Sequence, residues 1–142
     1  MLKRILCVLF TGIMVQGLYA SDVTNLAGDW KVIDDKSGFT LVKVKITQQQ
    51  ANTYQGHIVE AFNLPNLPAQ DISPLKGFHL LHNLKQDPKD PYKLNAGEVI
   101  DPVINQRYQV NGKLSRKGST MILRSPSDSD KASRKLSWIK MR

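Results

Sequence analysis

The stretch "GDWKVIDDKSGFTLVKVKIT", residues 28–47, decides the expected fold of this chain. Within it, the apolar residues of segment 42–46 alternate with Lys43 and Lys45. Alternation of this kind puts apolar side chains on one face and charged ones on the other, which is typical of a half-buried β-strand. The acidic, serine and glycine residues of segment 34–38 directly before it predict a turn.

A second alternating segment follows after the polar residues 48–52. In "TYQGHIV", residues 53–59, the side chains of Tyr54, Gly56 and Ile58 share one face. Two alternating segments separated by a short polar loop predict a β-hairpin.

The rest of the chain repeats this pattern of short strands and turns. Further strands are expected at 77–85, 95–100, 105–114, 119–125 and 134–141. About eight short strands at regular spacing, with no long amphipathic helix, predict an all-β barrel or sandwich.

Two segments between strands carry stronger signals. The prolines of residues 61–76 exclude a central strand or a helix interior there, so we expect a long loop with at most a turn or two of helix. The Asn111-Gly112 pair predicts a tight turn. Loops as long as 61–76 are usually functional or mobile.

The first twenty residues have the composition of a secretory signal. Lys3 and Arg4 precede a short apolar run, and a small residue ends the segment before Ser21. We therefore expect a periplasmic or secreted protein, with residues 21–142 as a single domain; an uncleaved anchor is the alternative. The single cysteine, Cys7, lies in the signal, so no disulfide or thiol chemistry is expected in the mature domain.

Positive charge is concentrated near the end of the chain. The net charge is +8, and residues 113–142 carry nine Lys or Arg against two Asp. Such a region could attract anionic lipid, whereas the simpler interpretation is a solvated, solubilising face. Nucleic-acid binding is not expected, because Trp138 is the only aromatic residue after Tyr108.

Several short motifs, taken in order, resemble one family of exported bacterial proteins, the domain of unknown function 2147. The motifs are Gly28-x-Trp30, Tyr54-x-Gly56-x-Ile58, the Gly-led strand 77–85, "GEVIDPVINQRY" at 97–108, and Trp138-x-Lys140. The Cys-x-x-Cys that often precedes the family's central strand is absent here, which argues against a thiol or metal role. The resemblance implies an antiparallel, up-and-down, lipocalin-like β-barrel with no assigned biochemical function.

The resemblance also implies a role for Trp30. In the lipocalin arrangement, a Trp of this motif packs across the closed end of the barrel under a basic side chain. We therefore expect Trp30 to close the barrel, covered by Lys140 or Arg142, rather than to touch a ligand.

A barrel of about eight strands is either filled by its own side chains or holds one small ligand. We expect a small apolar or amphipathic ligand, and the alternative is a non-enzymatic envelope protein that binds anionic lipid or a protein partner through its basic region. Inward positions on the central strands supply the candidate ligand contacts, although the same residues could be ordinary core. These residues are Tyr54, Ile58, Phe78, Leu80, Val99, Tyr108 and Met121.

Signals for catalysis and for metal or cofactor binding are weak, and none of these roles is expected. On a regular strand, His79 and His82 would point to opposite faces, and His57 stands alone. Asp101, before a proline, is interpreted as a turn residue rather than a catalytic one.

Overall fold

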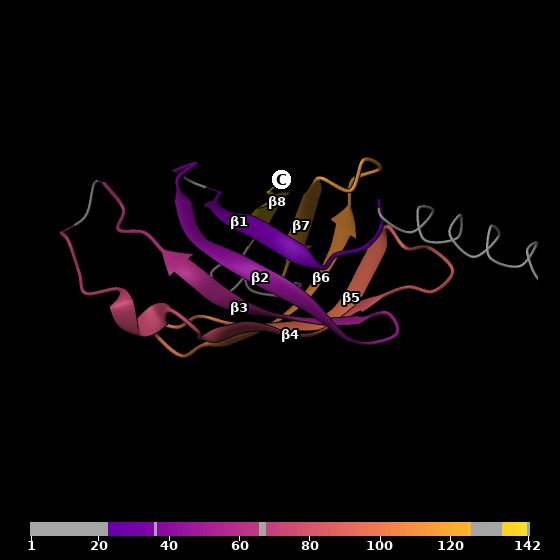
Figure 1. Cartoon of the computed structure of the whole chain (residues 1–142), viewed down its shortest axis with the longest axis horizontal. Helices are drawn as coiled ribbons and strands as arrows, with labels where there is room; N and C mark the ends of the chain where they lie inside the picture. Colours follow the sequence, from indigo (N-terminus) through magenta and orange to yellow (C-terminus); the bar gives the residue numbers. More distant parts are fainter. Residues whose placement is uncertain (1–22, 36, 66–67, 126–134, 142) are drawn as a thin grey trace, which may run out of the picture.

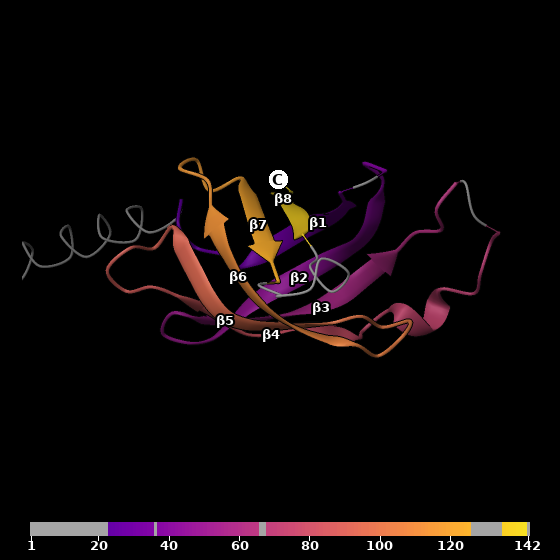
Figure 2. The ribbon, with the colours of Figure 1, turned by 180° about the vertical axis from the view of Figure 1, so that it is seen from behind.

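The computed structural model describes residues 23–35, 37–65, 68–125 and 135–141. The predicted signal segment lies outside these residues. Eight strands form a closed barrel in which each strand is antiparallel to the next and the last pairs with the first (Figures 1 and 2). The prediction of an all-β, up-and-down barrel of about eight strands is confirmed. The strands are β1 (Gly28–Asp34), β2 (Thr40–Gln50), β3 (Thr53–Ala61), β4 (His79–Gln86), β5 (Lys93–Ile100), β6 (Arg107–Leu114), β7 (Thr120–Arg124) and β8 (Lys135–Lys140).

Alternation along the strands produces the core. Val44 pairs with Trp30 on one side and Ile58 on the other, and all three side chains are fully buried. The neighbours of Val44 along β2, Lys43 and Lys45, carry charged side chains, as the alternation in this segment predicted. Within the described residues, no helix is long and apolar enough to cross a membrane.

One end of the barrel is closed by the segment before β1. Gln86 at the end of β4 donates to the carbonyl oxygen of Thr24 at 2.7 Å, and Lys140 of β8 donates to that of Asn25 at 2.8 Å. The backbone carbonyl of Val23 lies against Gly118 in the turn between β6 and β7. Residues 23–27 are thereby held by three separate parts of the barrel rim.

Trp30 lies beneath this segment. Its indole N–H donates to the Leu26 carbonyl oxygen at 2.8 Å, and the Lys140 ammonium sits 5.7 Å from the ring centroid. The prediction that Trp30 closes the barrel under a basic residue is confirmed, with Lys140 as that residue. Trp138, on the neighbouring β8, is also fully buried.

Two local predictions are wrong. Asn111 and Gly112 form no turn, because β6 continues through them, and Gly112 pairs with Leu94 and Leu123. The turn follows β6 instead: the Ser115 hydroxyl accepts the backbone N–H of Thr120 at 3.1 Å, and Gly118 adopts a φ of 73°.

The second correction concerns β4. Gly56 of β3 pairs with Leu81, whereas the next residue, His57, pairs with His79, so two steps on β4 oppose one step on β3. This is a β-bulge. Leu80 and Leu81 consequently both face the core, and the regular alternation assumed for His79 and His82 is broken.

Candidate functional site

The other end of the barrel contains a cavity of about 530 Å³. Its apolar wall comes from residues on all eight strands of the barrel. These wall residues are Val32, Leu41, Val42, Ile58, Leu80, Val99, Val110, Leu123 and Leu136. The volume lies within the range of roughly 300–1,000 Å³ usual for small-molecule sites.

Large side chains fill the barrel below this cavity. Trp30, Trp138, Tyr54 and Met121 are all buried, and none of them lines the cavity. The barrel is therefore filled at the end closed by residues 23–27 and hollow at the opposite end.

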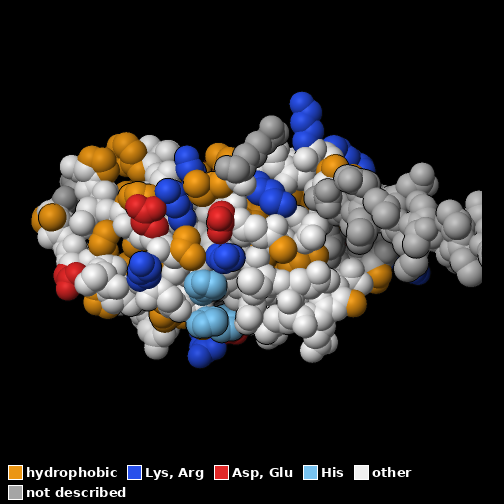
Figure 3. Space-filling view, viewed as in Figure 1, with side chains coloured by type: hydrophobic (Ala, Val, Ile, Leu, Met, Phe, Trp, Pro, Cys, Tyr) orange, Lys and Arg blue, Asp and Glu red, His pale blue; other side chains and the backbone are white. Residues whose placement is uncertain are grey.

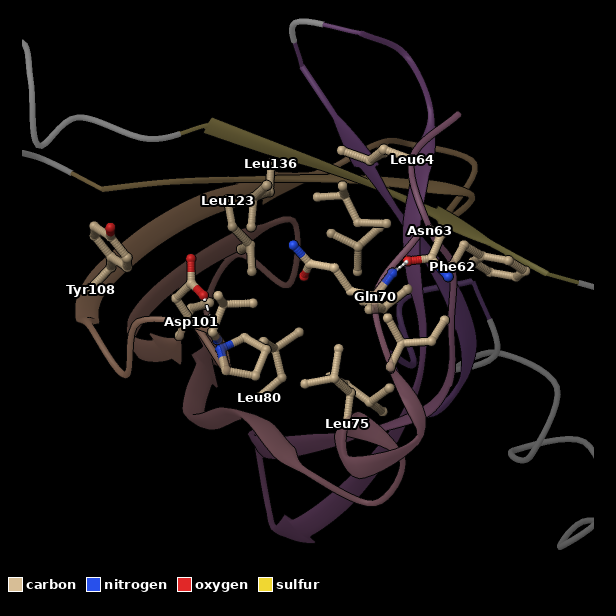
Figure 4. Close-up of a pocket in the computed structure, with 18 of the residues that line it drawn as sticks. Phe62, Asn63, Leu64, Gln70, Leu75, Leu80, Asp101, Tyr108, Leu123 and Leu136 are labelled. Carbon is tan, nitrogen blue, oxygen red and sulfur yellow. Dashed lines mark hydrogen bonds between the residues drawn. The ribbon is translucent and has the colours of Figure 1, made fainter. Parts of the chain in front are cut away.

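The long segment between β3 and β4 forms one side of the cavity mouth. Phe62, Asn63 and Leu64 begin it, and the 3-10 helix η2 (Ser73–Leu75) ends it. The backbone N–H of Gln70 donates to the Asn63 side-chain oxygen at 3.0 Å, which ties the two halves of the segment together. Figure 4 shows the Gln70 side chain reaching toward the centre of the mouth and Leu75 facing the cavity from below.

The turn between β5 and β6 forms the opposite side of the mouth. The Asp101 carboxylate accepts the backbone N–H of Val103 at 2.9 Å, and the Asp101 N–H donates to the Gln106 carbonyl oxygen at 2.8 Å. These bonds confirm Asp101 as a turn residue. Asn105 in this turn adopts a φ of 55°, a left-handed conformation that asparagine tolerates.

Four of the seven residues predicted to contact a ligand line this cavity. They are Ile58, Leu80, Val99 and Tyr108. The other three do not line it: Tyr54 and Met121 belong to the filled end, and Phe78 packs against the core from the start of β4. Whether the four bind a ligand stays a prediction.

No pattern in the sequence indicates the residues of the mouth. Phe62, Asn63, Leu64, Gln70 and Leu75 lie in a proline-containing loop, where no period indicates which side chains turn inward. The missed wall residues Val32, Val110, Leu123 and Leu136 do carry a signal, because each alternates with outward-facing neighbours on its strand. Val42 lines the cavity together with its neighbour Leu41, which alternation does not predict.

Tyr54 has a defined hydrogen-bond partner within the barrel. Its hydroxyl donates to the Gln86 side-chain oxygen at 3.3 Å. Burial raises the pKa of the Tyr54 phenol above its ordinary value of 10.0, and a backbone hydrogen bond with Leu26 partly opposes the shift.

This raised pKa gives a testable dependence of stability on pH. Above about pH 10 the unfolded chain releases the phenolic proton before the folded chain does, so the free energy of unfolding should fall as pH rises. Denaturant titrations at several alkaline pH values should show a shallower fall for Tyr54→Phe than for the unchanged chain. Equal slopes in the two proteins would show that Tyr54 does not titrate differently on folding.

The described basic residues near the end of the chain do not form one patch. Arg116, Lys117 and Lys140 lie at the closed end, whereas Arg124 and Lys135 are paired residues at the cavity end. Arg116 also stacks over Tyr92 at 4.5 Å, and Lys140 covers Trp30. Lys113 lies on β6, and the other three basic residues of this region lie outside the described residues: Lys131, Arg134 and Arg142.

Comparison with known proteins identifies the fold and a family. The family model described as "Uncharacterized protein conserved in bacteria (DUF2147)" matches residues 28–139. Among solved structures, protein HP1028 from the human pathogen Helicobacter pylori, described as belonging to the lipocalin family, is similar with a TM-score of 0.57. It shares 12% sequence identity, and the match covers 83% of this chain and 84% of that one. No curated protein matches the sequence.

Proposed function

Because this chain belongs to the bacterial family DUF2147 and has a lipocalin-like fold, we propose that it binds a small apolar or amphipathic molecule in its barrel cavity. The observation that carries this proposal is the cavity of about 530 Å³ at one end of an otherwise filled barrel. The protein acts as a non-enzymatic carrier. The signal-like composition of residues 1–20 supports export to the periplasm or the exterior.

The distribution of side chains around the cavity fits an amphipathic ligand. The strand residues of the wall are mainly apolar, whereas Asn63, Gln70, Asp71 and Asp101 lie on the two segments that form the mouth. An apolar body would lie inside with a polar group at the mouth. Burial of roughly 200 Å² of apolar ligand surface would contribute about 5 kcal/mol before the costs of association.

A fluorescent probe tests the proposal directly. Among the described lining residues the charged ones are both acidic, Asp71 and Asp101, so a neutral probe such as N-phenyl-1-naphthylamine is preferable to an anionic one. The probe should gain fluorescence on addition of the protein. Mass spectrometry of any co-purifying molecule, after its release by denaturation, would identify the chemical class of the natural ligand.

Val99→Phe should weaken probe binding by about tenfold or more, because the added ring occupies the cavity wall. Val99 lines the cavity and is 4% exposed. Ile122→Phe is the matched control, since Ile122 is 37% exposed on the outer surface of β7. Equal probe affinity in Val99→Phe, Ile122→Phe and the unchanged chain would place the probe outside the cavity and overturn the proposal.

A further inference from the structure

The three histidines of the chain gather on the outer wall of the barrel. The ring centroids of His57 and His79 lie 5.8 Å apart, and those of His79 and His82 lie 6.2 Å apart. Figure 3 shows the histidine side chains side by side on one face of the molecule, beside lysine and arginine side chains. This surface is on the opposite side of the barrel wall from the cavity.

The β4 bulge creates this cluster. His57 of β3 pairs directly with His79 of β4, which places both side chains on the outer face. Because Leu80 and Leu81 both turn inward, His82 returns to the same outer face as His79. A regular strand would have separated the two residues.

We propose that His57, His79 and His82 form a surface site for one divalent late transition metal, such as Cu²⁺ or Zn²⁺. Neutral imidazole nitrogens are good ligands for these ions. With metal–nitrogen distances of about 2.0–2.1 Å, the centres of two imidazole rings sharing one metal lie roughly 5–6 Å apart. The observed separations of 5.8 and 6.2 Å are close to this range.

One hydrogen bond already orients the His82 ring. The Nε2 atom of His82 lies 2.9 Å from the His79 carbonyl oxygen. A carbonyl oxygen only accepts, so Nε2 carries the proton and Nδ1 keeps the lone pair that can bind a metal. Metal-binding histidines commonly donate their other ring N–H to a backbone carbonyl in this way.

The proposed site requires side-chain rotations to bring the three imidazoles around one ion. In the described part of the chain, no three ligating groups already surround a single point. His79 is exposed, and its ring can therefore rotate toward His57 and His82 with little steric cost. Solvent would occupy the remaining coordination position, as in open metal sites.

The strands on either side of the histidines carry charges of opposite sign. Lys45 of β2 pairs with His57, and its positive charge opposes a bound cation. Glu98 of β5 pairs with His82, and its carboxylate accepts from Arg107 at 2.8 Å. Removing the Lys45 charge should therefore strengthen metal binding, and this gives a variant with an effect opposite to that of a lost ligand.

Isothermal titration of tag-free protein with CuCl₂ and with ZnCl₂ tests the proposal. We expect one metal ion per chain, with Cu²⁺ bound more tightly than Zn²⁺. His79→Gln should weaken binding by at least about tenfold, and His57→Gln should do the same. Lys45→Gln should bind at least as tightly as the unchanged chain. The absence of an affinity tag matters because polyhistidine binds the same ions.

Thermal unfolding of each variant without metal separates lost binding from lost structure. His57→Gln and His79→Gln should unfold close to the unchanged chain, because both side chains lie on the outer surface. Saturable binding lost in both histidine variants and retained in Lys45→Gln supports the site. No measurable binding, or binding that survives His57→Gln and His79→Gln, overturns it.

Discussion

Trp30→Ala is expected to lower the free energy of unfolding by about 3–5 kcal/mol. Trp30 has no solvent-exposed surface, so its truncation removes a large apolar contact area and leaves a cavity at the closed end. The change also leaves the Leu26 carbonyl without the indole N–H and the Lys140 ammonium without its aromatic face. Urea denaturation followed by circular dichroism measures the loss without depending on tryptophan fluorescence.

Two milder variants divide this loss into its parts. Trp30→Phe keeps an aromatic ring and removes the N–H donor, so it should cost less than Trp30→Ala. Lys140→Met keeps the aliphatic chain and removes the ammonium. The expected cost is about 1 kcal/mol for the lost cation–π contact and about 1 kcal/mol more for the lost hydrogen bond to the Asn25 carbonyl oxygen. A loss below about 1 kcal/mol for Trp30→Ala would mean that the segment 23–27 closes the barrel without it.

Gly112→Ala is expected to cost about 3 kcal/mol or more, at the upper end of the range for overpacked cores. A Cβ atom at position 112 would lie 2.1 Å from the carbonyl oxygen of Ile122 and 2.7 Å from the side chain of Leu123. The first contact is with the backbone, so β6 and β7 would have to move apart. Chemical denaturation monitored by circular dichroism gives the magnitude.

Gly38→Ala is the matched control for this variant. A Cβ atom there meets nothing within 4 Å, and the φ of 77° alone should cost roughly 1–2 kcal/mol. The comparison also tests the β6 register, because a turn at Asn111-Gly112 would not bring Gly112 against Ile122. If Gly112→Ala were no more destabilising than Gly38→Ala, the pairing of β6 with β7 described above would be incorrect.

The candidate site was predictable only in part. Ile58, Leu80, Val99 and Tyr108 lie on strands, where alternation indicates which side chains face inward. Alternation does not indicate depth along the barrel. Tyr54 and Ile58 share a face of β3, yet Tyr54 lies in the filled end and Ile58 lines the cavity.

The sequence by itself determined most of the strands and most of their inward faces, and its resemblance to a known family indicated the closing tryptophan. These features depend on local periods and on short motifs, which do not change with the identity of the neighbouring strand. Strand alternation with a period of two is a property of the backbone, and burial of the apolar face follows from it.

Only the tertiary structure decided the bulge, the histidine cluster, the course of β6 and the cavity mouth. The bulge at Leu80 and Leu81 lies in the pairing of β4 with β3, whereas β4 pairs with β5 in a constant register. The preference of Asn111-Gly112 for a turn, worth little on its own, gave way to the pairing of β6 with both of its neighbours. Each of these outcomes is set by contacts between residues distant in sequence, whose combined free energy exceeds any local preference.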